Sequence, residues 1–342
     1  MKALCFREHG DLEQIKYEEV PKPECKTNEV LIEIKACALN HLDIWVRRGW
    51  PGLSLDKPHW CGADISGVVS AVGSSVKERK VGQRVVVCPG ITTKSDEFTQ
   101  RGEDSLSPHY AILGEHLRGG AAEFIAVPES STKVMPDELG FAEGAAPLLV
   151  TLTAWRMLIN RARLKAGESV LIVGAGGGVN TMSIQIAKLA GAKVYVVASN
   201  ERKAQLAKEL GADVVIDRSE TNWSKAIYKM THKRGVDLVV DNVGAATINQ
   251  SLRAAARGGR IAIVGNTSGP HAEIDLRFIF GKQLEIIGST MGSQHDFEII
   301  TRLLWSGKLK PVIDRTMPLA SGKEAYSLME NSEQFGKIVL EP

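Results

Sequence analysis

The pattern of apolar and polar residues changes about halfway along the chain. Up to about residue 145, short apolar runs are separated by glycine and proline, and apolar residues seldom recur at helical spacing. This pattern predicts a compact, mainly β domain. The runs predicted as strands lie at residues 2–6, 29–37, 65–72, 84–88 and 121–127. A polar stretch between Gly90 and His116 is long for a connection inside a compact domain, which indicates a surface lobe or a functional loop.

From about Leu148 the chain alternates between buried-type strands and amphipathic helices. The strands are predicted at residues 170–173, 194–197, 214–216, 238–241, 260–264 and 284–288. The helices are predicted at residues 152–159, 202–210, 247–256 and 296–306. Such alternation predicts a parallel sheet with helices on both faces, and an α/β fold class. The last thirty or so residues, with Pro311 and Pro318, leave the pattern. We expect domains at 1–147 and 148–310, with residues 311–342 returning to the first.

The stretch from Glu168 to Ala198 carries the most specific signal. A β-branched apolar run leads into residues 174–178, Gly-Ala-Gly-Gly-Gly, and a helical segment and a second strand follow. Glycine accepts positive φ and lets a phosphate approach the backbone, and free N–H groups at a helix start attract anions. A tight turn without a ligand is the alternative, but the strand, helix and strand lie where a dinucleotide site needs them. Asn180 departs from the usual pattern, because it replaces the last glycine.

Composition excludes several classes of protein. The 342 residues have 44% hydrophobic and 24% charged content, which is ordinary for a globular protein of two domains. A net charge of +2 gives no indication of nucleic-acid or membrane binding. No apolar run reaches the roughly 20 residues of a membrane helix, and the first ten residues lack a signal-peptide core. Five scattered cysteines without a CxxC pair favour a reduced, cytoplasmic location.

Several motifs together resemble the medium-chain dehydrogenase/reductase superfamily. They are GADISGVVSAVG (62–73), GGAAEFIAVP (119–128), LTAWRML (152–158), the glycine loop, VDNVG (240–244), GGRIAIVG (258–265) and FGKIVL (335–340). The resemblance covers nearly the whole chain. It implies a GroES-like, mainly β catalytic domain, a Rossmann cofactor domain, a cleft between them, and a homodimer or homotetramer.

The zinc-type alcohol dehydrogenases of this superfamily hold a catalytic Zn²⁺ with Cys and His. At the matching positions this chain has Asn40 and Ala63, and residues 145–155 contain no Cys, His, Asp or Glu. The four cysteines of the family's structural zinc lobe are replaced by Thr93, Asp96, Thr99 and Ser107. We therefore expect no metal, and the chain is similar in this respect to the zinc-free quinone oxidoreductase branch.

The candidate catalytic residues are Asn40 and His41. The resemblance implies that Asn40 hydrogen-bonds the cofactor ribose or the substrate. Two interpretations of His41 stay open: a proton donor or partner of the cofactor, or a polar residue that orients the loop. Asp43 and Asp64 are interpreted as buried carboxylates that brace Arg47 or the backbone. We expect Asn40→Ala and His41→Ala each to lower kcat with little change in fold stability.

The predicted cofactor is NADP(H). An NAD site usually has Asp or Glu about 20 residues beyond the glycine motif, and the chain has Ala198 there, followed by Ser199 and soon by two cations. Glu201 is the counter-evidence. From the glycine loop and the resemblance, the cofactor-binding residues are predicted to be Thr153, Gly174, Gly176, Gly177, Gly178, Val179, Ser199, Arg202, Lys203, Arg218, Asn242, Gly265, Asn266 and Met291.

These features predict a zinc-independent, NADPH-dependent oxidoreductase that transfers hydride to a quinone, an enone or a conjugated ketone. One alternative is a secondary alcohol dehydrogenase with an atypical metal site built from His41, His59, Cys61 or Asp64. Another is a catalytically inactive dinucleotide-binding redox sensor. The sequence does not identify the physiological substrate.

Overall fold

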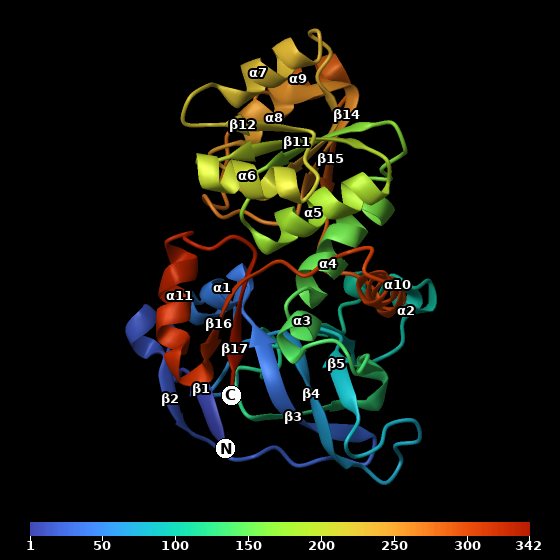
Figure 1. The fold of residues 1–342 in the computed structure, drawn as a ribbon, viewed down its shortest axis with the longest axis vertical. Coiled ribbons are helices and arrows are strands. Elements are labelled where there is room, and N and C mark those ends of the chain that lie inside the picture. The colour runs from blue at the N-terminus through green and yellow to red at the C-terminus, as the bar shows by residue number, and fades with distance from the viewer. The chain divides into compact units, whose positions relative to one another are not determined.

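The computed structural model describes residues 1–342 and divides into two compact units, each described here by itself (Figure 1). Unit 1 comprises Met1–Leu149 and Gly292–Pro342, and unit 2 comprises Val150–Met291. Unit 1 is mainly β and unit 2 contains one parallel sheet between helices. The α/β class expected from the sequence is therefore confirmed.

Unit 1 is built around the ten-residue strand β3, whose apolar residues are almost all buried. Its sheet has the order β16-β17-β3-β4-β5-β9, and β8 also pairs with β3. The strands of this unit are β1 (Lys2–Cys5), β2 (Lys16–Glu19), β3 (Glu29–Ala38), β4 (Asp64–Val72), β5 (Arg84–Val87), β6 (Gly90–Thr92), β7 (Tyr110–Ile112), β8 (Phe124–Pro128), β9 (Thr132–Val134), β16 (Ile313–Pro318) and β17 (Lys337–Glu341). The pairing of β17 with the end of β3 brings the carboxyl-terminal strand beside the residues that precede α1 (His41–Arg48).

Four further helices belong to this unit. They are α2 (Glu97–Gln100), α3 (Phe141–Ala145), α10 (Gln294–Trp305) and α11 (Gly322–Glu330), with 3-10 turns at η1 (Leu12–Gln14), η2 (Asp104–Leu106), η3 (Glu129–Ser131) and η5 (Leu319–Ser321). The boundary of unit 2 falls at Met291, whereas the sequence pattern placed it at residue 310. The reason is a pair of contacts between residues far apart in the sequence: Gln294 donates its backbone N–H to Asp104, and Lys133 forms an ion pair with Glu298. These contacts attach α10 to the first unit.

Unit 2 has a six-stranded parallel sheet in the order β12-β11-β10-β13-β14-β15. This is the order of dinucleotide-binding domains, in which the connection reverses direction between β10 and β13. The strands are β10 (Ser169–Val173), β11 (Lys193–Ala198), β12 (Val214–Asp217), β13 (Val236–Asp241), β14 (Ala255–Ile263) and β15 (Glu285–Gly288). The helices are α4 (Leu148–Trp155), η4 (Arg156–Arg161), α5 (Gly178–Leu189), α6 (Glu201–Glu209), α7 (Trp223–Met230), α8 (Ile248–Ala254) and α9 (Leu276–Lys282).

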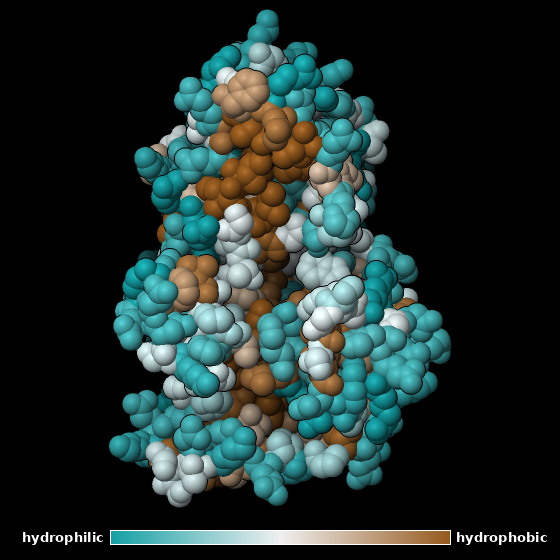
Figure 2. Space-filling view, turned by 180° about the vertical axis from the view of Figure 1, so that it is seen from behind, coloured by the Kyte–Doolittle hydropathy of each residue, from teal (hydrophilic) through white to brown (hydrophobic).

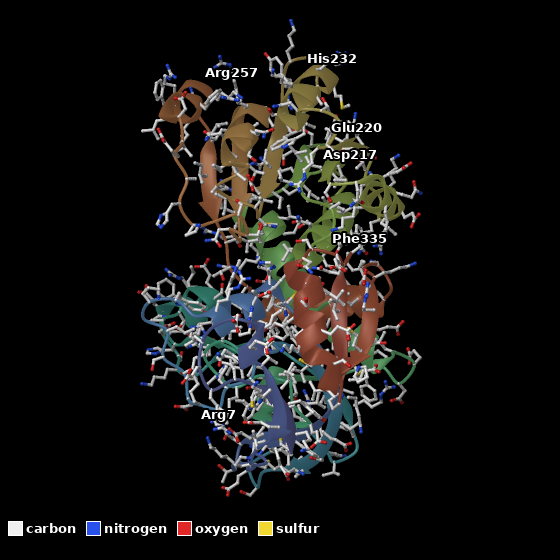
Figure 3. All side chains as sticks on the ribbon, turned by 90° about the vertical axis from the view of Figure 1, so that its left-hand side faces the viewer. Arg7, Asp217, Glu220, His232, Arg257 and Phe335 are labelled. Atoms are coloured by element: carbon white, nitrogen blue, oxygen red, sulfur yellow. The ribbon has the colours of Figure 1, made fainter.

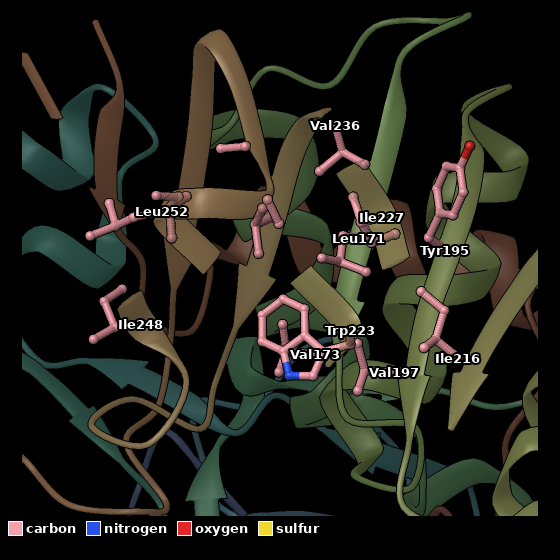
Figure 4. Close-up of a cluster of buried hydrophobic side chains, with 14 of the residues drawn as sticks. Leu171, Val173, Tyr195, Val197, Ile216, Trp223, Ile227, Val236, Ile248 and Leu252 are labelled. Carbon is pink, nitrogen blue, oxygen red and sulfur yellow. The ribbon is translucent and has the colours of Figure 1, made fainter. Parts of the chain in front are cut away.

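The central strands β10 and β13 are buried on both faces, which explains their continuous apolar runs. Helices α5 and α6 pack on one face of the sheet, and α7, α8 and α9 on the other (Figure 1). Between α7, α8 and the sheet, the ring of Trp223 lies among Leu171, Val173 and Ile227 (Figure 4). This core fixes the strand ends, where the predicted site residues lie. No helix of the structure is both long enough and apolar enough to cross a membrane.

Candidate active site

The glycine loop of unit 2 joins β10 to α5 and fits a phosphate. Gly174 has φ +97°, which an L side chain rarely adopts, and a Cβ added at Gly177 would meet nothing within 4 Å. Gly177 is the N-cap of α5, and its lack of a side chain leaves the helix start without a side-chain cap. The first N–H groups of this twelve-residue helix, from Gly178 and Val179 onward, therefore remain available to an anion.

The other predicted cofactor residues lie with the glycine loop at one edge of the parallel sheet. Most of them follow the carboxyl end of a strand, and carboxyl ends of parallel strands meet at the same edge. Gly174 and Gly176 follow β10, Ser199 follows β11, Arg218 follows β12, Asn242 follows β13, Gly265 and Asn266 follow β14, and Met291 follows β15. Arg202 and Lys203 lie in the first turn of α6. Thr153 comes from α4 and is buried. The topology thus groups the residues as a dinucleotide site requires.

Asn180, the departure from the glycine pattern, has a structural role that the motif did not predict. Its Nδ2 donates to the carbonyl oxygens of Val173 (3.0 Å) and Gly174 (2.8 Å), at the end of β10. Its Oδ1 accepts from Nδ2 of Asn242 (2.8 Å), and Asn242 Oδ1 accepts the N–H of Val264 (3.2 Å). Two side-chain amides therefore connect the ends of β10, β13 and β14 at the point where the strand order reverses.

Four further hydrogen bonds, all to Asp241, shape this edge. The buried carboxylate of Asp241 accepts the N–H groups of Val243 and Gly244 and the hydroxyls of Thr247 and Ser251, so it holds the loop after β13. This role was missed in the sequence, where Asp241 appears only as part of VDNVG.

Thr153 and Met291 lie beside each other, although they are near opposite ends of the sequence of unit 2. Thr153 Oγ1 is 4.0 Å from Met291 Sδ, and both side chains are buried. Met291 has φ +46°, which is rare for a bulky residue and is concentrated at functional sites. Thr153 and Met291 were each predicted on their own to bind the cofactor, and in the structure they form one small surface.

The end of β11 lacks a carboxylate, but the end of β12 has one. Ala198 pairs with Asp217, and the N–H of Arg218 donates to Ala198 O (3.0 Å). Asp217 Oδ1 accepts both the N–H and the hydroxyl of Ser219, and these hydrogen bonds lower the pKa of the Asp217 carboxyl. Figure 3 shows Asp217 and Glu220 close together at this corner. Sequence reasoning missed Asp217, because it considered only the strand that directly follows the glycine loop.

In unit 1, Asn40 belongs to a buried trio of polar side chains. Asn40 Nδ2 donates to Asp64 Oδ2 (2.9 Å), and the ammonium of Lys337 donates to Asn40 Oδ1 (2.5 Å) and to Asp64 Oδ2 (2.6 Å). Asp64 Oδ1 also accepts the N–H of Leu149 (2.6 Å). All three side chains are at most 6% exposed. Lys337 was missed in the sequence, and its only signal was a charged residue at the start of an apolar terminal strand.

Asp43 braces the backbone around this trio, as the sequence interpretation held. Its carboxylate accepts the N–H groups of Asn40 (2.7 Å) and Gly62 (3.2 Å). Burial nevertheless raises the pKa of the Asp43 carboxyl to about 6. Arg47, the other expected partner, pairs instead with Glu330.

His41 is the first residue of α1 and is half-buried. Its ring lies edge-on to Trp45, with centroids 5.2 Å apart. Desolvation, reinforced by the nearby Arg48 cation, lowers the pKa of the His41 imidazole below its ordinary value. A lowered pKa favours the neutral ring, and with it a hydrogen-bonding role over that of an imidazolium acid.

The residues proposed for an atypical metal site do not come together. No three His, Cys, Asp or Glu side chains converge where they could hold a metal ion. His59 is buried and its Nε2 bonds Gly114 O (3.1 Å), and burial lowers its pKa to about 4. Burial also raises the pKa of the Cys61 thiol well above its usual value, which disfavours the thiolate that binds metals.

Comparison with known proteins places this geometry in a family. Residues 26–137 match the model described as alcohol dehydrogenase GroES-like domain, and residues 178–306 match the one described as zinc-binding dehydrogenase. Acryloyl-coenzyme A reductase of Sulfurisphaera tokodaii is 31% identical, with 100% of both chains covered. Quinone oxidoreductase of Homo sapiens is 30% identical, with 99% of this chain and 97% of that one covered. A solved structure described as NAD-dependent alcohol dehydrogenase is 42% identical, with a TM-score of 0.95 and 100% of both chains covered.

The chain therefore belongs to the medium-chain dehydrogenase/reductase superfamily. It is an NAD(P)-dependent oxidoreductase of the alcohol dehydrogenase and quinone reductase type.

The residues present do not fit the catalytic zinc for which one of the matched models is named. Zinc in proteins selects thiolate and imidazole ligands. Here the carbonyl oxygen of Asn40 is already bonded to an ammonium, and Ala63 offers no ligand. The lobe positions do not fit a structural zinc either. Asp96 instead accepts from the Ser107 hydroxyl (2.7 Å) and the Thr99 N–H (3.0 Å).

Proposed function

We propose that this protein is a zinc-independent, NADPH-dependent oxidoreductase that transfers hydride to a quinone, an enone or a conjugated ketone. The observation that carries the proposal is the buried trio of Asn40, Asp64 and Lys337. An amide, a carboxylate and an ammonium, bonded to one another, stand where the resemblance to zinc-type enzymes implies a metal ligand. The names of two relatives, a quinone reductase and an acryloyl thioester reductase, are consistent with conjugated acceptors.

The residues of unit 2 fit the dinucleotide that this activity needs. The uncapped start of α5 and the open backbone at Gly177 would hold its pyrophosphate. When bound, a nicotinamide supplies the hydride. Thr153 and Met291 would form an apolar contact for its ring, and the Asn180–Asn242 connection would keep the strand ends beneath it in register.

The side chains of unit 1 would stabilise the charge that hydride transfer creates on the acceptor oxygen. Asn40 has one Nδ2–H bonded to Asp64 and a second available to the substrate oxygen or the cofactor ribose. His41, whose pKa is lowered by desolvation, would accept or donate a hydrogen bond at the cofactor ribose and pass on a proton. Oxidation of NADPH by the protein as purified, followed across quinones, enones and ketones, tests the proposal. Cofactor binding without turnover of any acceptor would support the redox-sensor alternative.

We further propose that the protein prefers NADPH over NADH. Three cations, Arg202, Lys203 and Arg218, lie at the corner that would hold the ribose 2′-phosphate, and no carboxylate ends β11. Asp217 stands against the proposal, as does the NAD-dependent description of the structure at 42% identity. Since the Asp217 carboxylate is already bonded to Ser219, we propose that the cations decide the choice.

We expect kcat/KM to be at least tenfold higher with NADPH than with NADH. Arg218→Ala should lower kcat/KM for NADPH by about tenfold and leave that for NADH nearly unchanged, because a lost charged hydrogen bond costs about 1.5–3 kcal/mol. Lys229→Ala, which removes an exposed cation from the far end of α7, is the matched control. A preference for NADH in the wild-type protein would contradict the expectation.

We also propose that the protein is a homo-oligomer through the outer edge of unit 2. Strand β15 ends the sheet and pairs only with β14, so one row of its backbone groups lacks a strand partner. Beside it, apolar side chains are exposed at Leu276 (62%), Phe280 (71%) and Ile286 (42%). Figure 2 shows a broad apolar area on unit 2. A second copy of this chain, adding its own β15, would cover both features.

We expect light scattering to give a mass of two or four chains, and Phe280→Asp to shift it toward one chain. Tyr228→Asp, at an exposed apolar position on α7, is the control and should leave the mass unchanged. A wild-type protein that remains monomeric at micromolar concentration would contradict this.

A further inference from the structure

The Lys337 ammonium is a buried cation with no role of its own in the mechanism proposed above. It lies at the start of β17 and is 4% exposed. Burial of an ammonium is costly unless the charge is paired and its donors are bonded. Asp64 supplies the opposite charge at 2.6 Å, and Asn40 supplies a second acceptor at 2.5 Å.

The pairing fixes which way the Asn40 carboxamide faces. An ammonium only donates hydrogen bonds and a carboxylate only accepts them. Asn40 Oδ1 must therefore face Lys337, and Nδ2 must face Asp64. These two bonds leave one Nδ2–H of Asn40 uncommitted, in a direction that the amide plane sets.

The same geometry makes that remaining N–H a better donor. A cation bonded to an amide oxygen draws electron density from the nitrogen, and hydrogen bonds in a chain polarise one another by about 10–30%. The bonds that Asn40 makes to Lys337 and Asp64 are charge-assisted, and such bonds are about twice as strong as neutral ones. Lys337 thus withdraws electron density from Asn40, and it is held in place by protein side chains alone.

We infer that Lys337 is a positioning residue that orients and polarises the Asn40 carboxamide, so that the ammonium supplies the positive charge that a metal supplies in zinc-type relatives. This inference rests on the proposed function. No atom is transferred to or from Lys337 in it, and its effect reaches the substrate oxygen through Asn40.

The test must separate this role from simple neutralisation of Asp64. Lys337→Met should lower kcat by on the order of 10- to 100-fold with little change in KM, and it should lower Tm because Asp64 is left without its cation. In Lys337→Met/Asp64→Asn both charges are gone, so Tm should recover while kcat stays low. Lys323→Met, which breaks the exposed pair with Glu13, is the control and should keep kcat within about twofold.

If the double variant regains wild-type kcat, Lys337 serves only to balance Asp64 and the inference is overturned. The kinetics use whichever acceptor the wild-type protein reduces fastest, so they do not depend on a preference for conjugated acceptors. A second readout needs no turnover: the side-chain amide resonance of Asn40, assigned by its loss in Asn40→Ala, should shift in Lys337→Met. An unchanged resonance would overturn the inference even for a protein without measurable activity.

Discussion

Asn40→Ala is expected to lower kcat about a hundredfold on the best acceptor, because it removes an oriented hydrogen-bond donor from the charge that develops on the substrate. The structure shows that Asn40 also bonds Asp64 and Lys337, so its loss should reduce the free energy of unfolding by about 1–3 kcal/mol. The sequence had suggested little change in stability, and that holds better for His41→Ala. The measurement is kcat and Tm for both variants, with Asn28→Ala as an exposed control.

The two catalytic candidates should differ in their pH dependence. The pKa of His41 is lowered by desolvation, so protonation occurs only below its ordinary pKa of about 6.5. If the neutral ring is the active form, kcat should be flat from pH 7 to 8 and should fall as His41 becomes protonated at acid pH. His41→Ala should lower kcat and remove this acid limb. Wild-type kcat in both Asn40→Ala and His41→Ala would place the chemistry elsewhere.

The second large effect that we expect is a preference for conjugated acceptors over simple ketones. Hydride addition to an enone or a quinone gives a delocalised anion, whereas addition to a simple aliphatic ketone gives a localised alkoxide that needs a strong electrophile. A site that offers amide and ammonium donors, and no Zn²⁺ ligands, should therefore favour conjugated acceptors.

We expect kcat/KM for a small enone or quinone to exceed that for its saturated ketone by about a hundredfold, or roughly 2.7 kcal/mol in activation free energy. Matched pairs that differ only in the C=C bond make the comparison independent of size. Ethanol or another simple alcohol as the best substrate would contradict the argument and favour the alcohol dehydrogenase alternative.

The sequence predicted the strands and helices of unit 2 better than it predicted the polar contacts between residues that are far apart in the chain. Strands such as β10 and β13 are continuous apolar runs because both of their faces are buried, and a glycine loop between strand and helix has few alternatives. Asn180 was judged only as a missing glycine. Its partner Asn242 lies 62 residues away, and no local pattern records that the two amides meet.

The trio in unit 1 shows the same limit more strongly. Asn40 was a candidate because of its position in the family motif, but Lys337 lies 297 residues further along the chain. The two meet because β17 pairs with β3 just before α1. A lysine in an apolar terminal strand indicates that a buried partner exists, and only the sheet shows which one it is. The boundary at α10 had a similar cause, since Glu298 and Gln294 bond residues near 104 and 133.

The central claim, that this oxidoreductase works without zinc, is tested most directly by measuring metal content and activity on one sample. The protein is dialysed against a strong chelator, its zinc is determined by elemental analysis, and NADPH-dependent reduction of the best acceptor is compared before and after. We expect far less than one zinc per chain and an unchanged kcat. Stoichiometric zinc that the chelator removes together with activity would contradict it.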